Sequence, residues 1–157
     1  MAMTSRKPPG NDGEKRTILL IDDDPSMREA LLFALRRTYR VVVAQNAVAG
    51  LKAMNADVSA VILDIKMEGP DGFWACEQIQ KAHPHTPIIF HSAYQDLKDP
   101  FEVINQHRPF AYIVKGHPGQ LFDAIARAIA LHDRLLEYRD VLDRLDRVQE
   151  RMKLFRK

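Results

Sequence analysis

The chain has 157 residues, 23 of them basic and 21 acidic, for a formal net charge of +2. This length suits one domain of about 100–150 residues with an extension. This balanced net charge gives no evidence that the chain binds nucleic acid or a membrane. Cys76 is the only cysteine, which excludes an internal disulfide. No apolar run approaches the ~20 residues that span a bilayer, so we expect no membrane among the partners of this chain. Because the charge is balanced, we also expect no nucleic acid among them.

The first 16 residues are polar, contain Pro8-Pro9-Gly10 and lack the apolar middle of a signal peptide. We interpret residues 1–16 as the disordered leader of a cytoplasmic protein. A folded domain is expected over residues 17–131, followed by a helical extension over residues 132–157.

From residue 17 onward, short apolar runs alternate with segments of helical periodicity. The predicted strands are Thr17–Ile21, Arg40–Ala44, Val58–Leu63, Ile88–His91 and Ala111–Val114. The predicted helices begin at Pro25, cover Ala47–Asn55, Phe73–Lys81 and a segment from Asp99-Pro100 to His107, and begin again near Pro118. Strands that alternate with helices in this way predict a doubly wound α/β fold with a five-stranded parallel sheet.

Carboxylates directly follow two of the predicted strands. Asp22-Asp23-Asp24 comes after the first strand, and Asp64 comes after the third. Open parallel sheets build their sites at the edge where the carboxyl ends of the strands meet. Carboxylates gathered there would repel one another without a cation, and oxygen-rich clusters suit Mg²⁺. The sequence therefore predicts a Mg²⁺ site at this edge, with Asp64 placed to react.

Residues 17–131 resemble the receiver domain of two-component response regulators, a flavodoxin-like fold. The resemblance is carried by four groups at or near strand ends: Asp22-Asp23, Asp64-Ile65-Lys66-Met67 with Asp71-Gly72, Ser92-Ala93, and Tyr112-Ile113-Val114-Lys115. It covers almost three quarters of the chain.

The resemblance implies that Asp64 accepts a phosphoryl group from a sensor histidine kinase or a phosphotransfer protein. It implies Mg²⁺ as the cofactor, bound by Asp23, Asp64 and the backbone carbonyl of Lys66, with Asp22 acting largely through water. A carboxylate nucleophile of this kind forms an acyl phosphate. No enzymatic activity is expected beyond self-phosphorylation and autodephosphorylation.

The resemblance also implies a switch. The Ser92 hydroxyl and the Lys115 ammonium would hold phosphoryl oxygens, and Tyr112 would rotate inward when Ser92 moves toward the phosphate. The signal would leave through the face formed by the fourth helix, the fifth strand and the fifth helix. Plain packing of Tyr112 without switching is the alternative.

Three segments depart from the receiver pattern. Glu68-Gly69-Pro70 follows Met67, where a proline is usual. Arg108-Pro109-Phe110 replaces a small, glycine-containing turn. Gly116 follows Lys115 in place of a proline with a cis bond. We predict that the Lys115–Gly116 bond is trans, because a cis bond without proline costs about 3–4 kcal/mol.

The extension has the pattern of a coiled coil. Its apolar residues step alternately by three and four: Tyr138, Val141, Leu145, Val148, Met152 and Phe155. We predict a parallel two-stranded coiled coil that makes the protein a homodimer. The alternative is an amphipathic helix folded back on its own domain. The extension is too short for a DNA-reading or catalytic output domain, so the protein acts through partners or the chain is the N-terminal part of something longer.

Two other functions fit parts of the pattern. A degenerate receiver would assemble without taking phosphate, although the acids, Ser92 and Lys115 are intact. A phosphatase of the haloacid-dehalogenase type would use Asp22 as nucleophile and Asp24 as acid, but it would leave Asp64 unexplained and have little room for a cap.

Overall fold

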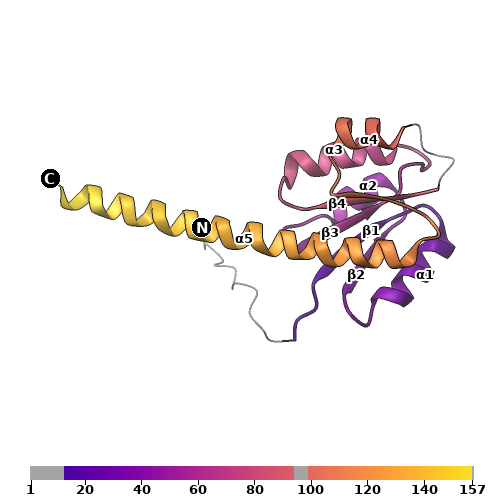
Figure 1. Cartoon of the computed structure of the whole chain (residues 1–157), viewed down its shortest axis with the longest axis horizontal. Coiled ribbons are helices and arrows are strands. Elements are labelled where there is room, and N and C mark those ends of the chain that lie inside the picture. Colours follow the sequence, from indigo (N-terminus) through magenta and orange to yellow (C-terminus); the bar gives the residue numbers. More distant parts are fainter. Residues whose placement is uncertain (1–12, 94–98, 157) are drawn as a thin grey trace.

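The computed structural model describes residues 13–93 and 99–156, and it contains one five-stranded parallel sheet in the order β2-β1-β3-β4-β5 (Figure 1). The strands are β1 (Thr17–Ile21), β2 (Arg40–Ala44), β3 (Val58–Leu63), β4 (Ile88–Ser92) and β5 (Ala111–Val114). The helices are α1 (Pro25–Leu35), α2 (Ala47–Ala53), α3 (Gly72–Ala82), α4 (Pro100–His107) and α5 (Pro118–Phe155). This architecture confirms the predicted doubly wound, flavodoxin-like fold. Residues 1–12 of the predicted leader lie outside the described residues.

Helices cover both faces of the sheet. Alternate side chains of β1 point to opposite faces and join two different cores. Ile18 and Leu20 join a core with α1 and α5, whereas Leu19 and Ile21 join a core with α2, α3 and α4. Every residue of β3 is buried, as expected for a central strand of a parallel sheet.

The strand register brings the carboxyl ends of the central strands to one level. Ile21 pairs with Leu63, and the Asp64 backbone N–H donates to the Ile21 carbonyl at 2.9 Å. On the other side of β3, the Lys115 N–H donates to the Ser92 carbonyl at 2.8 Å. The residues that follow β1, β3, β4 and β5 therefore gather at one sheet edge.

Side-chain caps fix the starts of four helices. The N-cap residues, whose side chains accept a backbone N–H of the first turn, are Asp24, Asn46, Asp71 and Asp99. Asp24 caps α1, and its side chain accepts the backbone N–H of Ser26. Because Asp71 caps α3, that helix begins at Gly72, one residue before its predicted start.

α5 is a single helix of 38 residues with two different environments. Its first part, residues 118–132 (the packed segment), lies on the sheet, and His132 is its last buried residue. Residues 133–155 (the projecting segment) continue away from the domain for about 35 Å (Figure 1). The projecting segment does not fold back on the domain.

The chain before β1 also contacts α5. Arg16 forms an ion pair of 3.1 Å with Asp133, and its carbonyl accepts the Arg40 N–H at 2.9 Å. Among the described residues, no helix is both long and apolar enough to cross a bilayer.

Candidate functional site

Three carboxylates meet at the sheet edge where β1 and β3 end. One oxygen of each of Asp22, Asp23 and Asp64 lies within 4.8 Å of the others. Asp22 and Asp64 are 1% and 3% exposed, whereas Asp23 faces solvent. The structure thus brings together the acids that the sequence predicted, two of them almost out of water.

Lys115 reaches this cluster from the end of β5. Its Nζ lies 2.9 Å from Asp22 Oδ2 and 3.3 Å from Asp64 Oδ2. Burial alone would lower the pKa of Lys115, but its hydrogen bond to Asp22 and the charges of Asp22 and Asp64 outweigh burial and raise that pKa. Lys115 is therefore a fixed cation between two buried carboxylates.

Ser92 holds the other oxygen of Asp64. Its hydroxyl donates to Asp64 Oδ1 at 3.3 Å, so both carboxylate oxygens of Asp64 have a donor. Even so, burial and the charge of Asp22 raise the pKa of Asp64 to about 6, against the opposing effects of Lys115 and Ser92. The site therefore disfavours the ionised Asp64 that a nucleophile requires unless more positive charge is supplied.

The donor set fits a divalent cation. Three carboxylates and one ammonium leave the cluster short of positive charge. Clustered carboxylate oxygens are hard ligands of the kind that Mg²⁺ uses with water in its remaining positions. Lys66, whose carbonyl is the further predicted ligand, lies in the loop two residues after Asp64.

Hydrogen bonds between side chains and backbone, which the sequence did not predict, hold the turn that contains Asp22, Asp23 and Asp24. Arg28 of α1 donates from Nη1 to the Asp22 carbonyl at 2.7 Å. The Asp24 N–H donates to Asp22 Oδ1 at 2.9 Å. The Glu68 N–H donates to Asp23 Oδ2 at 3.3 Å, so the departing Glu68-Gly69-Pro70 segment is anchored to one of the acids.

Gly72 allows α3 to approach the reactive strand end. Its N–H donates to the Ile65 carbonyl at 2.7 Å. A Cβ at this position would collide with the Asp64 carbonyl and lie 2.7 Å from Ile65 Cα. The Asp71-Gly72 pair was a signal of this contact, because the N-cap requires Asp71 and the close packing requires Gly72.

Tyr112, the predicted switch residue, lies outside the acid cluster, as do two buried side chains, His91 and Cys76. Tyr112 packs on Phe90 with ring centroids 6.2 Å apart, and its hydroxyl oxygen is buried. His91 is buried on the α1–α5 side, and burial together with the charge of Lys115 lowers its pKa to about 4. His91 is thus neutral near neutral pH. Cys76 is a buried core residue, and burial raises its pKa to about 12.

The turn after β5 differs from a proline-containing one. No cis peptide bond occurs in residues 13–93 and 99–156, so Lys115–Gly116 is trans as predicted. Gly116 has φ of 97°, in the region that favours glycine. The trans bond is compatible with contact between Lys115 and both buried acids.

Comparison with known proteins agrees with this geometry. The sequence model for the response regulator receiver domain matches residues 18–126. The transcriptional regulatory protein GlrR of Escherichia coli is 34% identical over 102 residues, which are 62% of this chain and 22% of that protein. The transcriptional regulatory protein AfsQ1 of Streptomyces coelicolor is 33% identical over 115 residues, 72% of this chain and 50% of that protein. The chain thus spans about a fifth to a half of these relatives.

Solved structures are similar over the same region. A response regulator receiver domain protein from Clostridium thermocellum has a TM-score of 0.69 and 28% identity, with 76% of this chain and 98% of that chain covered. The response regulator TrrA from Thermotoga maritima, in complex with Mg²⁺ and BeF, has a TM-score of 0.63 and 28% identity over 72% of this chain and 98% of that one.

Proposed function

Because this chain belongs to the response regulator receiver domain family of two-component systems, we propose that Asp64 is its phosphoryl acceptor. The observation that carries the proposal is the surroundings of Asp64: a buried carboxylate with one oxygen held by Ser92, the other by Lys115, and two acids beside it. We take residues 17–131 as the receiver domain and residues 132–157 as its helical extension.

The proposed reaction transfers a phosphoryl group from a phosphohistidine of a sensor kinase or phosphotransfer protein. An oxygen of Asp64 bonds to phosphorus while the phosphorus–nitrogen bond of the donor breaks, which leaves an acyl phosphate. Such a transfer depends on positioning and on neutralisation of the charge of the moving group. Lys115 and Ser92 already contact the Asp64 oxygens, so small movements bring both onto the phosphoryl oxygens.

We propose Mg²⁺ as the cofactor, held by Asp22, Asp23, Asp64 and the Lys66 carbonyl. When bound, it supplies the positive charge that stabilises ionised Asp64 and the transferring group. Asp22 is paired with Lys115 at 2.9 Å, which supports the expectation that it acts on the cation largely through water. Asp23 is the exposed member of the cluster and is the acid that an entering cation meets first.

Phosphorylation by a small donor tests this assignment without the kinase. The protein is incubated with acetyl phosphate and Mg²⁺, and its intact mass is compared with that of the Asp64→Asn and Asp22→Asn variants. We expect one phosphate adduct on the parent chain and none on Asp64→Asn. Equal adducts on the parent and Asp64→Asn would reject the assignment, and no adduct on any chain would support a degenerate receiver.

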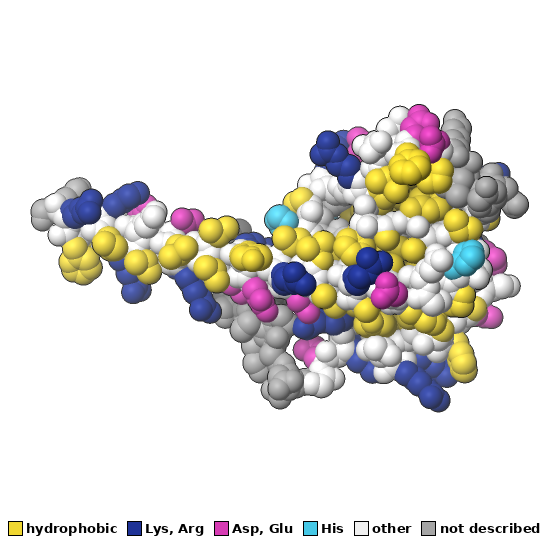
Figure 2. Space-filling view, in the orientation of Figure 1, with side chains coloured by type: hydrophobic (Ala, Val, Ile, Leu, Met, Phe, Trp, Pro, Cys, Tyr) yellow, Lys and Arg dark blue, Asp and Glu magenta, His cyan; other side chains and the backbone are white. Residues whose placement is uncertain are grey.

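For output, we propose that the chain acts through protein contacts in the cytoplasm and forms a homodimer through α5. The projecting segment has its apolar residues at heptad spacing, and all are exposed, Phe155 by 89%. Figure 2 shows hydrophobic side chains along this helix, continuous with those on the domain. A long exposed apolar stripe usually marks an interaction site.

The oligomeric state tests the homodimer. Light scattering is measured on the full chain and on a chain that ends at His132. We expect a dimer for the full chain and a monomer for the shorter one, because the packed segment ends at His132. A monomer in both cases, with or without beryllofluoride, would reject the dimer, and an unchanged dimer would place the interface on the receiver domain.

A further inference from the structure

The heptad pattern of α5 begins earlier than the projecting segment. Counted back from Tyr138, it includes Leu131, which is 38% exposed on the packed segment. The a positions are then Leu131, Tyr138, Leu145 and Met152, and the d positions are Arg134, Val141, Val148 and Phe155. This extended seam decides in which direction a second copy can lie.

The parallel pair that the heptad spacing led us to predict would oppose identical residues at each layer, with unfavourable results at two places. Arg134 would face Arg134 of the second copy in the seam. Arg151, at a g position, would face Arg156 at the following e position, where charges of opposite sign stabilise parallel pairs. Parallel dimers also prefer β-branched residues at a and leucine at d, whereas this chain has Leu145 at a and valine at both Val141 and Val148.

An antiparallel pair removes these conflicts. From the layers and charges, and resting on the proposed homodimer, we propose that a second copy of this chain binds α5 antiparallel, with its Phe155 opposite Leu131. Met152 then faces Arg134, and Glu137 at a g position faces the g-position arginines Arg144 and Arg151 of the second copy. This pairing places Glu137 beside arginines at both ends of the flank where the g positions of the two helices meet, while Arg144 lies near Arg144 of the second copy at the centre of that flank.

The side chains in the antiparallel layers also differ in size in a complementary way. Tyr138 faces Val148 of the second copy, and Leu145 faces Val141. Large residues opposite small ones allow layers to interdigitate at interior density. All four side chains are more than half exposed in the single chain, so this pairing would bury area that is now open to water.

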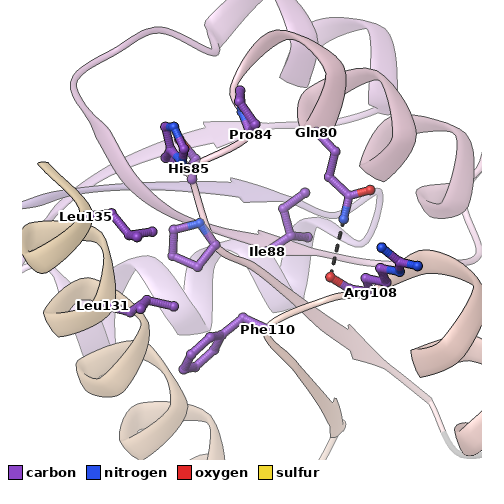
Figure 3. Close-up of a pocket in the computed structure, with 10 residues that line it drawn as sticks. Gln80, Pro84, His85, Ile88, Arg108, Phe110, Leu131 and Leu135 are labelled. Atoms are coloured by element: carbon purple, nitrogen blue, oxygen red, sulfur yellow. Dashed lines mark hydrogen bonds between the residues drawn. The ribbon is translucent and has the colours of Figure 1, made fainter. Parts of the chain in front are cut away.

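A groove on the receiver domain lies where the tip of the second helix would end. It has a volume of about 170 Å³ and lies between α5, the turn before β4 and the turn before β5 (Figure 3). Leu131 and Leu135 form its α5 side, and Pro87, Ile88 and Phe110 are among the residues that line the rest. In the proposed register Phe155, the most exposed of the large apolar side chains, lies against Leu131 at this groove.

Disulfide trapping separates the parallel and antiparallel directions. The native Cys76 is fully buried, so it does not compete with the introduced cysteines. In one experiment the full chains with Leu131→Cys and Phe155→Cys are mixed and oxidised. In the other, the chain with Met152→Cys is oxidised alone. In the antiparallel pair residues 131 and 155 are adjacent, whereas the two residues 152 are about 27 Å apart.

We expect a cross-linked heterodimer from the mixture and no cross-linked dimer from Met152→Cys. Rapid cross-linking of Met152→Cys, with none in the mixture, would overturn the antiparallel proposal and leave the homodimer standing. A monomer by light scattering with no cross-link in either experiment would overturn both.

A charge reversal provides a test in solution that needs no cysteine. Glu137→Arg should raise the dimer dissociation constant about fivefold or more, since it converts attraction to Arg144 and Arg151 into repulsion at both ends of the dimer. The matched control is Glu150→Arg, which makes the same change at an f position facing away from the seam. Equal effects of the two substitutions on the dissociation constant would reject the proposed pairing.

Discussion

The two segments of α5 belong to one continuous helix and yet depend on different forces. The packed segment buries Leu121, Ala124, Ile125 and Ala128 against the sheet. The projecting segment contacts the domain only near its start, at Asp133 and Leu135 among the described residues, and then carries an exposed apolar stripe at heptad spacing. Isolated helices are only marginally stable in water and usually depend on packing. The packed segment thus shares a core with the sheet within one chain, whereas the projecting segment leaves its apolar stripe exposed, which is the surface that the proposed dimer would cover.

The largest expected contrast comes from truncating one apolar side chain in each segment. Ile125→Ala should lower the free energy of unfolding of the receiver domain by about 2–5 kcal/mol, because Ile125 is fully buried. Leu145→Ala should leave that free energy unchanged and weaken the dimer instead. Trp74, the only tryptophan, lies in α3, so its fluorescence in urea reports unfolding of the receiver domain. Equal losses in the two variants would contradict the contrast.

Truncating one lysine in the receiver domain and one in the projecting segment should show the same contrast for charged side chains. Lys115→Ala should destabilise the receiver domain by about 2–4 kcal/mol at neutral pH without Mg²⁺, because it leaves Asp22 and Asp64 buried without their counter-ion. Lys153→Ala removes only an exposed pair with Glu150, which is worth about 0.5 kcal/mol or less. Urea titrations followed by Trp74 fluorescence measure both, and a Lys115→Ala effect as small as that of Lys153→Ala would show that the buried pair carries little energy.

The raised pKa of Asp64 predicts a pH dependence of the receiver domain. That pKa is about 6 in the folded chain and 3.8 in the reference state. Between these values folded Asp64 binds more protons than unfolded Asp64, so its contribution to the free energy of unfolding should fall as pH rises from about 4 to 6. Above pH 6 the ionised Asp64 should cost about 1–3 kcal/mol without Mg²⁺.

Asp64→Asn should recover this cost, making the variant more stable than the parent at pH 7. Urea unfolding at several pH values, with a metal chelator present, measures the difference. A parent whose stability rises with pH from 4 to 6 while the variant stays level would mean that burial does not disfavour ionised Asp64.

The smallest expected effect concerns the turn that joins the site to α5. Gly116→Ala should destabilise the receiver domain by about 1 kcal/mol, since Gly116 has φ of 97°. Gly119→Ala, three residues later in the first turns of α5, meets no neighbouring atom and should be neutral or stabilising by up to about 1 kcal/mol. Thermal unfolding of the two variants compares them, and a stabilised Gly116→Ala would be inconsistent with this backbone conformation.

The sequence was sufficient for the strands and the acid cluster. Val58–Leu63 is an uninterrupted apolar run that stops at Asp64, and such a run predicts both a central strand and a carboxylate at its end. The pairing of β1 with β3 then brings Asp22 beside Asp64 without further information. The heptad spacing after Tyr138 likewise predicted an apolar stripe along the helix, although the coiled coil inferred from it stays a prediction.

Contacts between distant segments could not be predicted in this way. Lys115 was expected to bind phosphoryl oxygens. Its contact with Asp22, which is shorter than its contact with Asp64, depends on where β5 ends relative to β1. The hydrogen bond from Arg28 to the Asp22 carbonyl depends on the angle at which α1 leaves the strand. Neither angle nor offset has a local sequence signal. The proposed antiparallel direction depends on extending the heptad pattern back to Leu131.

The most direct test of the account is to locate the phosphoryl group by chemical trapping. After incubation with acetyl phosphate and Mg²⁺, borohydride reduces an acyl phosphate and converts the modified aspartate to homoserine, which peptide mass spectrometry identifies. We expect homoserine at position 64 alone, in the full chain and in a chain that ends at His132, because the acid cluster and both hydrophobic cores lie within residues 18–129. Homoserine at position 22, or no modification at position 64, would contradict the central claim.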